Sequence, residues 1–210
     1  MLLHNDYFYW DGELDEKVCN ELIALGIEKF SAATVRVAEQ PITIEERTSG
    51  RNLETKVIEE YRKSDVVWLN EKWVRDLVIP YMWKANEEAG WNFIIDKIDR
   101  IQLTRYEVDG FYDWHRDGMS DTPASIKSPG HPDEGKVRKL SMTILLNDDY
   151  VGGEFQYSDY TEEKVTHNII PSKKMGTIFI FPLFKEHRIT SITKGIRYSL
   201  VTWFLGPPFK

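Results

Sequence analysis

Residues 176–205 read GTIFIFPLFKEHRITSITKGIRYSLVTWFL, and this stretch decides the fold class. Two of its segments, 176–181 and 197–205, are short and rich in Ile, Val, Phe, Tyr and Thr. Runs of this composition that are bounded by turn residues indicate β-strands. The C-terminal part of the chain is therefore predicted to be built from short strands.

Three earlier segments have the same character, namely 95–106, 139–146 and 165–170. Several short strands separated by turn residues are typical of a β-sandwich or a barrel. The sequence has no repeat, no low-complexity tract and no clear linker. A mainly β core is therefore expected in the second half of the chain.

The first half has a helical pattern. Asp15 is placed to cap a short helix, whose one-face spacing is given by Val18, Leu22 and Leu25. A second, longer helix is expected to follow Asn70 as its cap, and Pro80 is expected to kink or split it.

Length and composition complete the fold prediction. A chain of 210 residues with 41% hydrophobic residues fits one domain with a substantial core. We expect an α+β fold in a single domain, residues 1–210. Helical support would take up about 1–92, and the β core about 93–210.

Charge and targeting features limit the class of protein. The net charge of −7 and the pI near 5.3 argue against a protein that tracks nucleic-acid phosphates, and nucleic acid is an unlikely partner. Cys19 is the single cysteine, so no internal disulfide can form. The N-terminus resembles no targeting signal, and no stretch approaches the roughly 20 apolar residues that span a bilayer. A cytoplasmic protein with no membrane partner is expected.

A candidate metal site combines two parts of the chain. In His115-Arg116-Asp117, residues two apart point the same way on an extended chain, so an imidazole and a carboxylate would face one point. His187 follows 72 residues after His115. Two histidines and one carboxylate leave coordination positions open, as in non-haem Fe(II) oxygenases. His167 is an alternative to His187 as the third ligand. We favour His187 because an arginine, Arg197, lies ten residues beyond it, whereas Thr177 lies ten residues beyond His167.

These motifs resemble a known family. The stretches QLTRYEVDGFYDWHRD (102–117), LSMTILLNDDYVGGEF (140–155), GTIFIFP (176–182) and HRITSITKGIRYSLVTWF (187–204) resemble the 2-oxoglutarate/Fe(II) oxygenase superfamily. Within it they are most similar to the prolyl 4-hydroxylase-like, PKHD-type group. The resemblance implies a double-stranded β-helix, or jelly-roll, supported by the N-terminal helices.

The resemblance also implies the roles of individual residues. His115, Asp117 and His187 would be the iron ligands, and Arg197 would pair with the distal carboxylate of 2-oxoglutarate, which a guanidinium fork suits. Tyr106 and Ser199 are further candidates for contact with this co-substrate. Some relatives carry a second co-substrate tyrosine in the strand that here contains 143–146, which has none.

The implied activity is a 2-oxoglutarate-dependent dioxygenase with Fe(II) as cofactor, 2-oxoglutarate as co-substrate and ascorbate as a further candidate ligand. It would hydroxylate a prolyl residue of a peptide or protein and release succinate and CO₂. Three alternatives stay open: a hydroxylase of a free amino acid or another side chain, a cupin-like metal-binding protein without turnover, and a nucleic-acid demethylase of the same superfamily.

A long polar segment, residues 118–138, separates the first metal motif from the next expected strand. Long loops in compact domains are often functional, so we expect this one to cover the metal site and to help form the substrate site. Its cations, with Lys139 beside it, are candidates for meeting an acidic partner; they are Lys127, Lys136 and Arg138.

Overall fold

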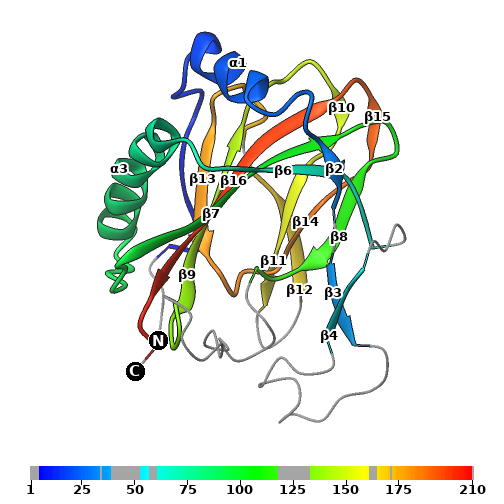
Figure 1. The fold of residues 1–210 in the computed structure, drawn as a ribbon. Helices are drawn as coiled ribbons and strands as arrows, with labels where there is room; N and C mark the ends of the chain where they lie inside the picture. Colours follow the sequence, from blue (N-terminus) through cyan, green and yellow to red (C-terminus); the bar gives the residue numbers. More distant parts are fainter. Residues whose placement is uncertain are drawn as a thin grey trace.

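The computed structural model describes residues 5–33, 35–38, 53–56, 61–117, 133–160, 165–170 and 172–209. Within these ranges two antiparallel sheets face each other in a jelly-roll, and two helices lie against the outer side of the larger sheet (Figure 1). The predicted fold class, a mainly β core of double-stranded β-helix type with supporting helices, is confirmed.

The larger sheet has seven strands among the described residues, in the order β1-β13-β9-β16-β7-β6-β2. Their bounds are β1 Phe8–Trp10, β2 Ser31–Ala32, β6 Asp65–Leu69, β7 Lys97–Tyr106, β9 Val137–Leu145, β13 Ile178–Pro182 and β16 Arg197–Gly206. The long central strand β16 pairs antiparallel with β7 on one side and β9 on the other over most of its length, so these three strands form the centre of the larger sheet.

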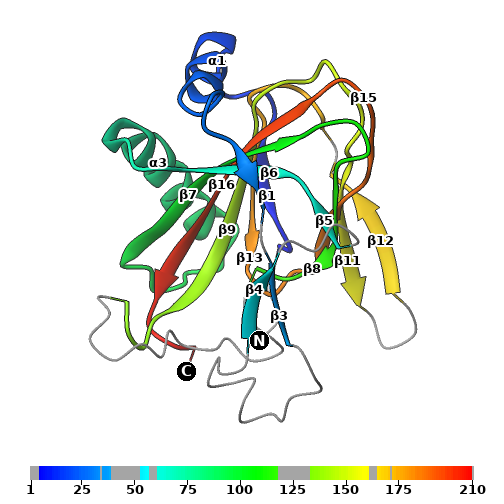
Figure 2. The same ribbon diagram turned by 45° about the vertical axis from the view of Figure 1, so that its right-hand side comes forward.

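The smaller sheet has five described strands in the order β12-β11-β14-β8-β5. They are β5 Arg62–Lys63, β8 Phe111–His115, β11 Phe155–Tyr160, β12 Val165–Ile169 and β14 His187–Ile189. Two short pairs stand apart from both sheets: β3 Val35–Ala38 with β4 Leu53–Lys56, and β10 Val151–Gly152 with β15 Ile192–Lys194. Figure 2 shows the two sheets splayed apart, with the helices on the far side of the larger one.

Strand β13 contributes side chains to two hydrophobic cores, one on each face of the larger sheet. Successive side chains of a strand point to opposite faces. Ile178 and Ile180 therefore pack toward the helices, whereas Phe179 and Phe181 pack into the space between the sheets. Burial of large apolar side chains contributes roughly 1.5–3 kcal/mol each, so both faces of this strand stabilise the fold.

Helix α1, Glu16–Ala24, forms as predicted. The Asp15 carboxylate accepts a hydrogen bond from the Val18 backbone N–H at 2.8 Å, and Leu22 is fully buried against the large sheet. Within the described ranges, no helix combines the length and the apolar composition needed to span a bilayer.

Two predictions about the first half were wrong in detail. The region up to about residue 92 is not helical support alone, because β1, β2 and β6 join the large sheet and β5 joins the small one. Helix α3, Lys72–Glu88, has Glu71 rather than Asn70 at its N-cap position, without a capping hydrogen bond from the side chain, and it continues through Pro80 as one helix.

Pro80 gives a direct test of helix energetics. A proline in a helix interior costs about 3 kcal/mol, whereas its effect on the unfolded chain contributes at most about 1 kcal/mol of stability. Since Pro80 is exposed, Pro80→Ala should raise the free energy of unfolding by about 2 kcal/mol, measured by urea denaturation. Glu87→Ala, an exposed change in the same helix, should stay within about 0.5 kcal/mol. A destabilised Pro80→Ala variant would contradict this account.

Candidate functional site

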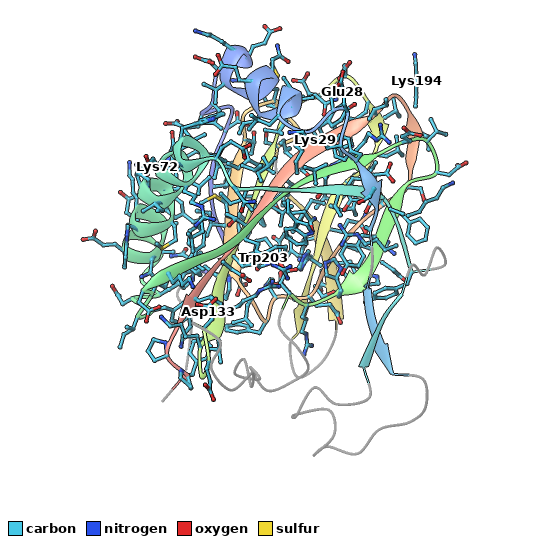
Figure 3. The ribbon with its side chains drawn as sticks, in the orientation of Figure 1. Glu28, Lys29, Lys72, Asp133, Lys194 and Trp203 are labelled. Atoms are coloured by element: carbon cyan, nitrogen blue, oxygen red, sulfur yellow. The ribbon has the colours of Figure 1, made fainter. Side chains whose placement is uncertain are left out.

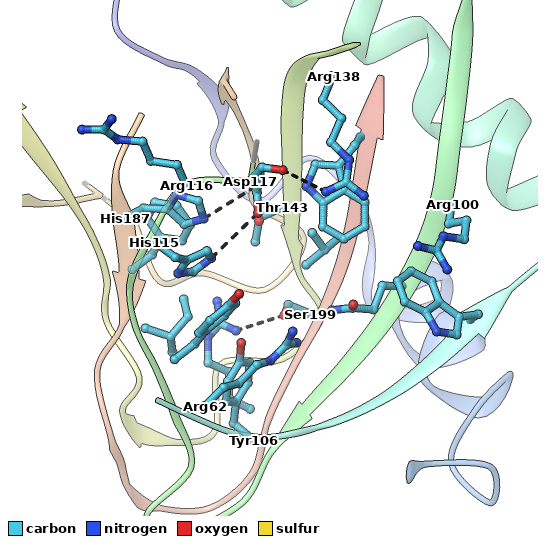
Figure 4. Close-up of a pocket in the computed structure, with 18 residues that line it drawn as sticks. Arg62, Arg100, Tyr106, His115, Arg116, Asp117, Arg138, Thr143, His187 and Ser199 are labelled. Atoms are coloured by element: carbon cyan, nitrogen blue, oxygen red, sulfur yellow. Dashed lines mark hydrogen bonds and ion pairs between the residues drawn. The ribbon is translucent and has the colours of Figure 1, made fainter. Parts of the chain in front are cut away.

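Two histidines meet through the pairing of β8 with β14. His115 and His187 are register partners, and their ring centroids lie 4.2 Å apart (Figure 4). Asp117, just beyond the end of β8, has Oδ1 3.8 Å from Nε2 of His115 and Oδ2 3.7 Å from Nε2 of His187. Their three side chains are only 6–10% exposed. The structure thus brings together all three residues that the sequence predicted as metal ligands.

The spacing of these atoms fits a metal ion. One ligand atom from each residue can be chosen so that all three lie within 4.8 Å of one another. Nitrogen and carboxylate ligands bind first-row metals such as zinc at about 2.0–2.2 Å, so donors almost 4 Å apart can share one ion. The donor set, two imidazoles and one carboxylate, is the facial triad of non-haem iron sites.

Backbone hydrogen bonds fix the tautomer of both histidines. The Nδ1–H of His115 donates to the Asp113 carbonyl at 2.7 Å, and the Nδ1–H of His187 donates to the Lys185 carbonyl at 2.9 Å. Because a carbonyl oxygen only accepts, the proton of each neutral ring is held at Nδ1. The lone pair at Nε2 is therefore directed toward Asp117, ready to bind a metal.

Electrostatics favour the same protonation states. Burial, reinforced by His187, lowers the pKa of His115 well below its usual value. Burial opposes ionisation of Asp117, but the pKa of this carboxyl is lowered, with the positive charge of Arg138 among the causes. At neutral pH the trio therefore presents a neutral His115 imidazole and a carboxylate, as metal binding requires.

Aromatic side chains enclose the trio. The Tyr112 ring stacks on His115 at 3.5 Å between centroids, and Phe155 lies nearly parallel to His187 at 5.2 Å. Burial raises the pKa of the Tyr112 phenol, so this side chain stays neutral. These walls limit access of water to the space around Nε2 of both histidines.

Arg197 lies deep in the same pocket with an incomplete set of partners. The side chain is 1% exposed, and its Nη1 donates to the Ser199 hydroxyl at 3.0 Å. Nε and Nη2 are buried with no hydrogen-bond partner in the part of the chain that the structure describes. Unpaired buried donors are costly, so this half-satisfied guanidinium is arranged for a partner that the chain does not provide.

The predicted neighbours of Arg197 are in place. Tyr106 is its register partner on β7, with the guanidinium carbon 5.4 Å from the centre of the phenol ring. Gly153 adopts φ +61°, and a Cβ there would lie only 3.0 Å from Cδ of Arg197. The same Cβ would lie only 2.4 Å from Cδ1 of Ile192, so another residue here would be strained and would displace Ile192 more than Arg197.

A pocket of about 380 Å³ joins Arg197 to the histidine–aspartate trio. Tyr106 and Ser199 line it, as the sequence predicted for co-substrate contacts. Sequence reasoning missed other lining residues, among them Arg62 and Thr143. No motif marks them, because their places follow from the register of β5 and β9.

Arg138 supports the trio from outside. Its guanidinium donates to the Asp117 backbone carbonyl at 2.9 Å and to the Asp99 carboxylate at 3.0 and 2.8 Å. The sequence predicted that Arg138 could bind an acidic partner molecule, but the acid that it binds is Asp99 of the same chain. Lys136 is likewise paired with Asp96 at 2.7 Å.

Three further predictions concern His167, a second co-substrate tyrosine and the long polar segment. His167 lies on β12, 3.1 Å from the Ser158 hydroxyl, and is not part of the trio. Leu145 is buried between the sheets, so no second tyrosine reaches the pocket from this strand. Residues 118–132, with His131 and Lys127, lie outside the described residues, and the predicted lid stays a prediction.

Comparison with known proteins gives three findings. A family model described as the 2OG-Fe(II) oxygenase superfamily matches residues 101–205, half of the chain. A PKHD-type hydroxylase of Synechococcus sp. (strain CC9311) is 31% identical over 135 residues, which are 63% of this chain and 53% of that protein. The chain thus spans about half the length of this relative.

Two solved structures share the fold. A prolyl-4-hydroxylase of Pseudomonas putida is 14% identical, with a TM-score of 0.61 over 95% of this chain and 92% of that one. A prolyl hydroxylase of Trichoplax adhaerens, in complex with a peptide of hypoxia inducible factor, is also 14% identical. Its TM-score is 0.59, over 95% of this chain and 83% of that one.

Proposed function

Since the chain belongs to the 2OG-Fe(II) oxygenase superfamily, we propose that it hydroxylates prolyl residues of a peptide or protein. Members of the family use Fe(II) and 2-oxoglutarate. One atom of O₂ would enter a C–H bond of the substrate. The other would enter succinate, as 2-oxoglutarate loses CO₂.

One observation carries this proposal: the half-satisfied Arg197 shares a pocket with the histidine–aspartate trio. A carboxylate accepts two parallel hydrogen bonds from a guanidinium fork. A cupin-like protein that only binds metal would gain nothing from a buried arginine with two unpaired nitrogens, and this arginine would lower its stability. The pairing favours an oxo acid with a distal carboxylate as co-substrate.

Each side chain then has a defined part. His115, Asp117 and His187 would hold Fe(II), which supplies activation of O₂ and oxidation of the substrate C–H bond. Arg197 would bind and orient 2-oxoglutarate, and the Ser199 and Tyr106 hydroxyls would donate to the same carboxylate. Tyr112 and Phe155 would keep water from the reacting atoms.

The substrate is proposed from the relatives. The Synechococcus relative is named a PKHD-type hydroxylase, and the two solved structures are named prolyl hydroxylases. The structure from Trichoplax adhaerens holds a peptide. A free amino acid or another protein side chain is the runner-up substrate, and ascorbate stays a prediction. The net charge of −7 disfavours a nucleic-acid demethylase.

Turnover tests the proposal in two steps. We expect the protein with Fe(II), O₂ and 2-oxoglutarate to release succinate, and release should rise when a suitable proline-containing peptide is added. Mass spectrometry of a peptide library should then show the gain of one oxygen on proline. Succinate release without any modified peptide, but with a modified free amino acid, would favour the runner-up. No iron-dependent succinate release would refute the oxygenase activity.

A further inference from the structure

The pocket extends beyond the trio to an aromatic and cationic surface. Its members are Trp68 on β6, Arg100 on β7 and Trp203 on β16, and all three line the pocket. Arg100 lies six residues from Tyr106 along β7, which is roughly 20 Å in a strand. We call these three residues the outer subsite. Arg100 lies well away from Ser199 and Tyr106 at the co-substrate end (Figure 4).

A β-bulge creates the outer subsite. The register between β16 and β7 shifts after Thr202, which faces Ile101, so that Phe204 faces Ile98. Asp99 and Arg100 are thus the two residues of β7 opposite Trp203. Bulges re-aim side chains and are frequent beside functional sites. Here the Asp99 carboxylate binds Arg138, whereas the Arg100 guanidinium lies 4.3 Å above the Trp68 ring.

Among the described residues Arg100 has no acidic partner, and it alone is exposed of the five arginines that line the pocket. Arg138 is paired with Asp99, and under the proposed function Arg197 binds 2-oxoglutarate. Arg100 is exposed, and its contact with Trp68 restricts its orientation without neutralising its charge.

The charge of the pocket is opposite to that of the chain. Among the described residues, five arginines and one acid, Asp117, line it, although the protein carries a net charge of −7. Bound Fe(II) would offset the charges of Asp117 and of the co-substrate together with Arg197. The exposed cation of Arg100 would therefore remain, together with the buried cation of Arg62, to attract an approaching anionic substrate.

Trp203 provides a second, independent feature. Its side chain is 94% buried, since only 6% is exposed, and the indole Nε1–H has no acceptor in the described part of the chain. An indole N–H only donates, so it requires an acceptor such as a peptide carbonyl. Trp68, whose ring centroid lies 6.4 Å from that of Trp203, is 42% exposed and offers an open aromatic face beside it.

We infer that the outer subsite selects an acidic residue of the peptide substrate, close in sequence to the residue that is hydroxylated. Arg100 pairs with the Asp or Glu side chain, Trp203 donates to a backbone carbonyl, and Trp68 holds Arg100 in position. This inference rests on the proposed peptide substrate. An acidic peptide fits better than a nucleic acid, because the surface around an overall acidic chain would repel an extended phosphate backbone.

Binding of matched peptides tests the subsite. The full chain, loaded with Fe(II) and 2-oxoglutarate without O₂, is titrated with fluorescent peptides that carry one proline flanked by Glu, Gln or Lys. Anisotropy should show about 3- to 10-fold tighter binding of the Glu peptides than of the Gln peptides, as expected for a charge-assisted hydrogen bond at a partly exposed site. Arg100→Glu should reverse the order, so that the Lys peptides bind best.

Lys194→Glu is the matched control. It changes the net charge by the same amount on exposed β15, at the top of the molecule in Figure 3, whereas Trp203 lies near its centre. This variant should keep the preference for Glu. Thermal unfolding of both variants verifies that they are folded. A third variant, Trp68→Leu, should weaken the preference without reversing it.

The outcomes separate this inference from the proposed function. Preference for Glu that depends on Arg100, with no peptide hydroxylated, would support the subsite and refute peptide hydroxylation. Hydroxylation of Glu, Gln and Lys peptides alike, unaffected by Arg100→Glu, would overturn the subsite and leave the function intact. A single-stranded oligonucleotide that displaces the Glu peptide, and itself requires Arg100, would overturn the inference in favour of a nucleic-acid substrate.

Discussion

Asp117→Ala should lower the affinity of the protein for Fe(II) by more than about 100-fold. Loss of a residue that only orients a metal ligand typically costs 10- to 100-fold in affinity, so loss of a ligand should exceed that range. The carboxylate lies between both imidazoles, and without it the remaining pair has no negative charge to offset the ion. Anaerobic calorimetry with Fe(II), or with Mn(II) as a stand-in, measures the effect.

Glu28→Ala is the control for this experiment, because it removes one carboxylate from an exposed position at the top of the molecule in Figure 3, and Glu28 does not line the pocket that holds the trio. Its metal affinity should match that of the unaltered protein. Succinate release should vanish only in the Asp117 variant. Unchanged Fe(II) affinity in Asp117→Ala would mean that the metal binds elsewhere.

Arg197→Ala should weaken 2-oxoglutarate binding by about 10- to 150-fold, which corresponds to a charge-assisted hydrogen bond of roughly 1.5–3 kcal/mol. Iron affinity should change much less, because no atom of Arg197 belongs to the trio. Arg197→Lys should lie in between, since an ammonium keeps the charge but not the planar fork. Calorimetry with 2-oxoglutarate in the presence of Mn(II) provides the measurement.

Stability distinguishes a binding role of Arg197 from a structural one. Arg197→Met replaces a buried, half-satisfied cation by an apolar side chain of similar length, so the protein without ligand should unfold at the same or a higher temperature. Arg75→Ala, on helix α3, should leave 2-oxoglutarate affinity unchanged. A variant at Arg197 that binds 2-oxoglutarate normally but unfolds easily would show that the arginine serves the fold.

The trio could be predicted from the sequence because its geometry is mostly local. His115 and Asp117 are two residues apart at the end of one strand, and only His187 had to be chosen among distant candidates. The spacing from His187 to Arg197 made that choice, and the structure places both in one pocket. Residues whose positions follow from a motif are thus accessible to sequence reasoning.

Residues whose positions depend on register were not accessible. Arg62 belongs to a two-residue strand, and Arg100 gains its orientation from a bulge that no local pattern marks. The strand β6 reads DVVWL, and an apolar run this short is compatible with several structures until β7 pairs with it. The residues of β6 favour a strand, but the helical spacing found elsewhere in the first half did not indicate that β5 and β6 would pair with β8 and β7.

The hydrogen bonds that orient the two imidazoles have a consequence for divergence. Their acceptors are main-chain carbonyls of residues 113 and 185, so the side chains of Asp113 and Lys185 are not needed to aim the rings. Substitutions at these positions can accumulate without rotating either imidazole, provided that the path of the backbone is retained. The orientation of the rings thus depends on the backbone conformation and not on the identity of these two side chains. Such a metal site can therefore be retained while the sequence around it diverges.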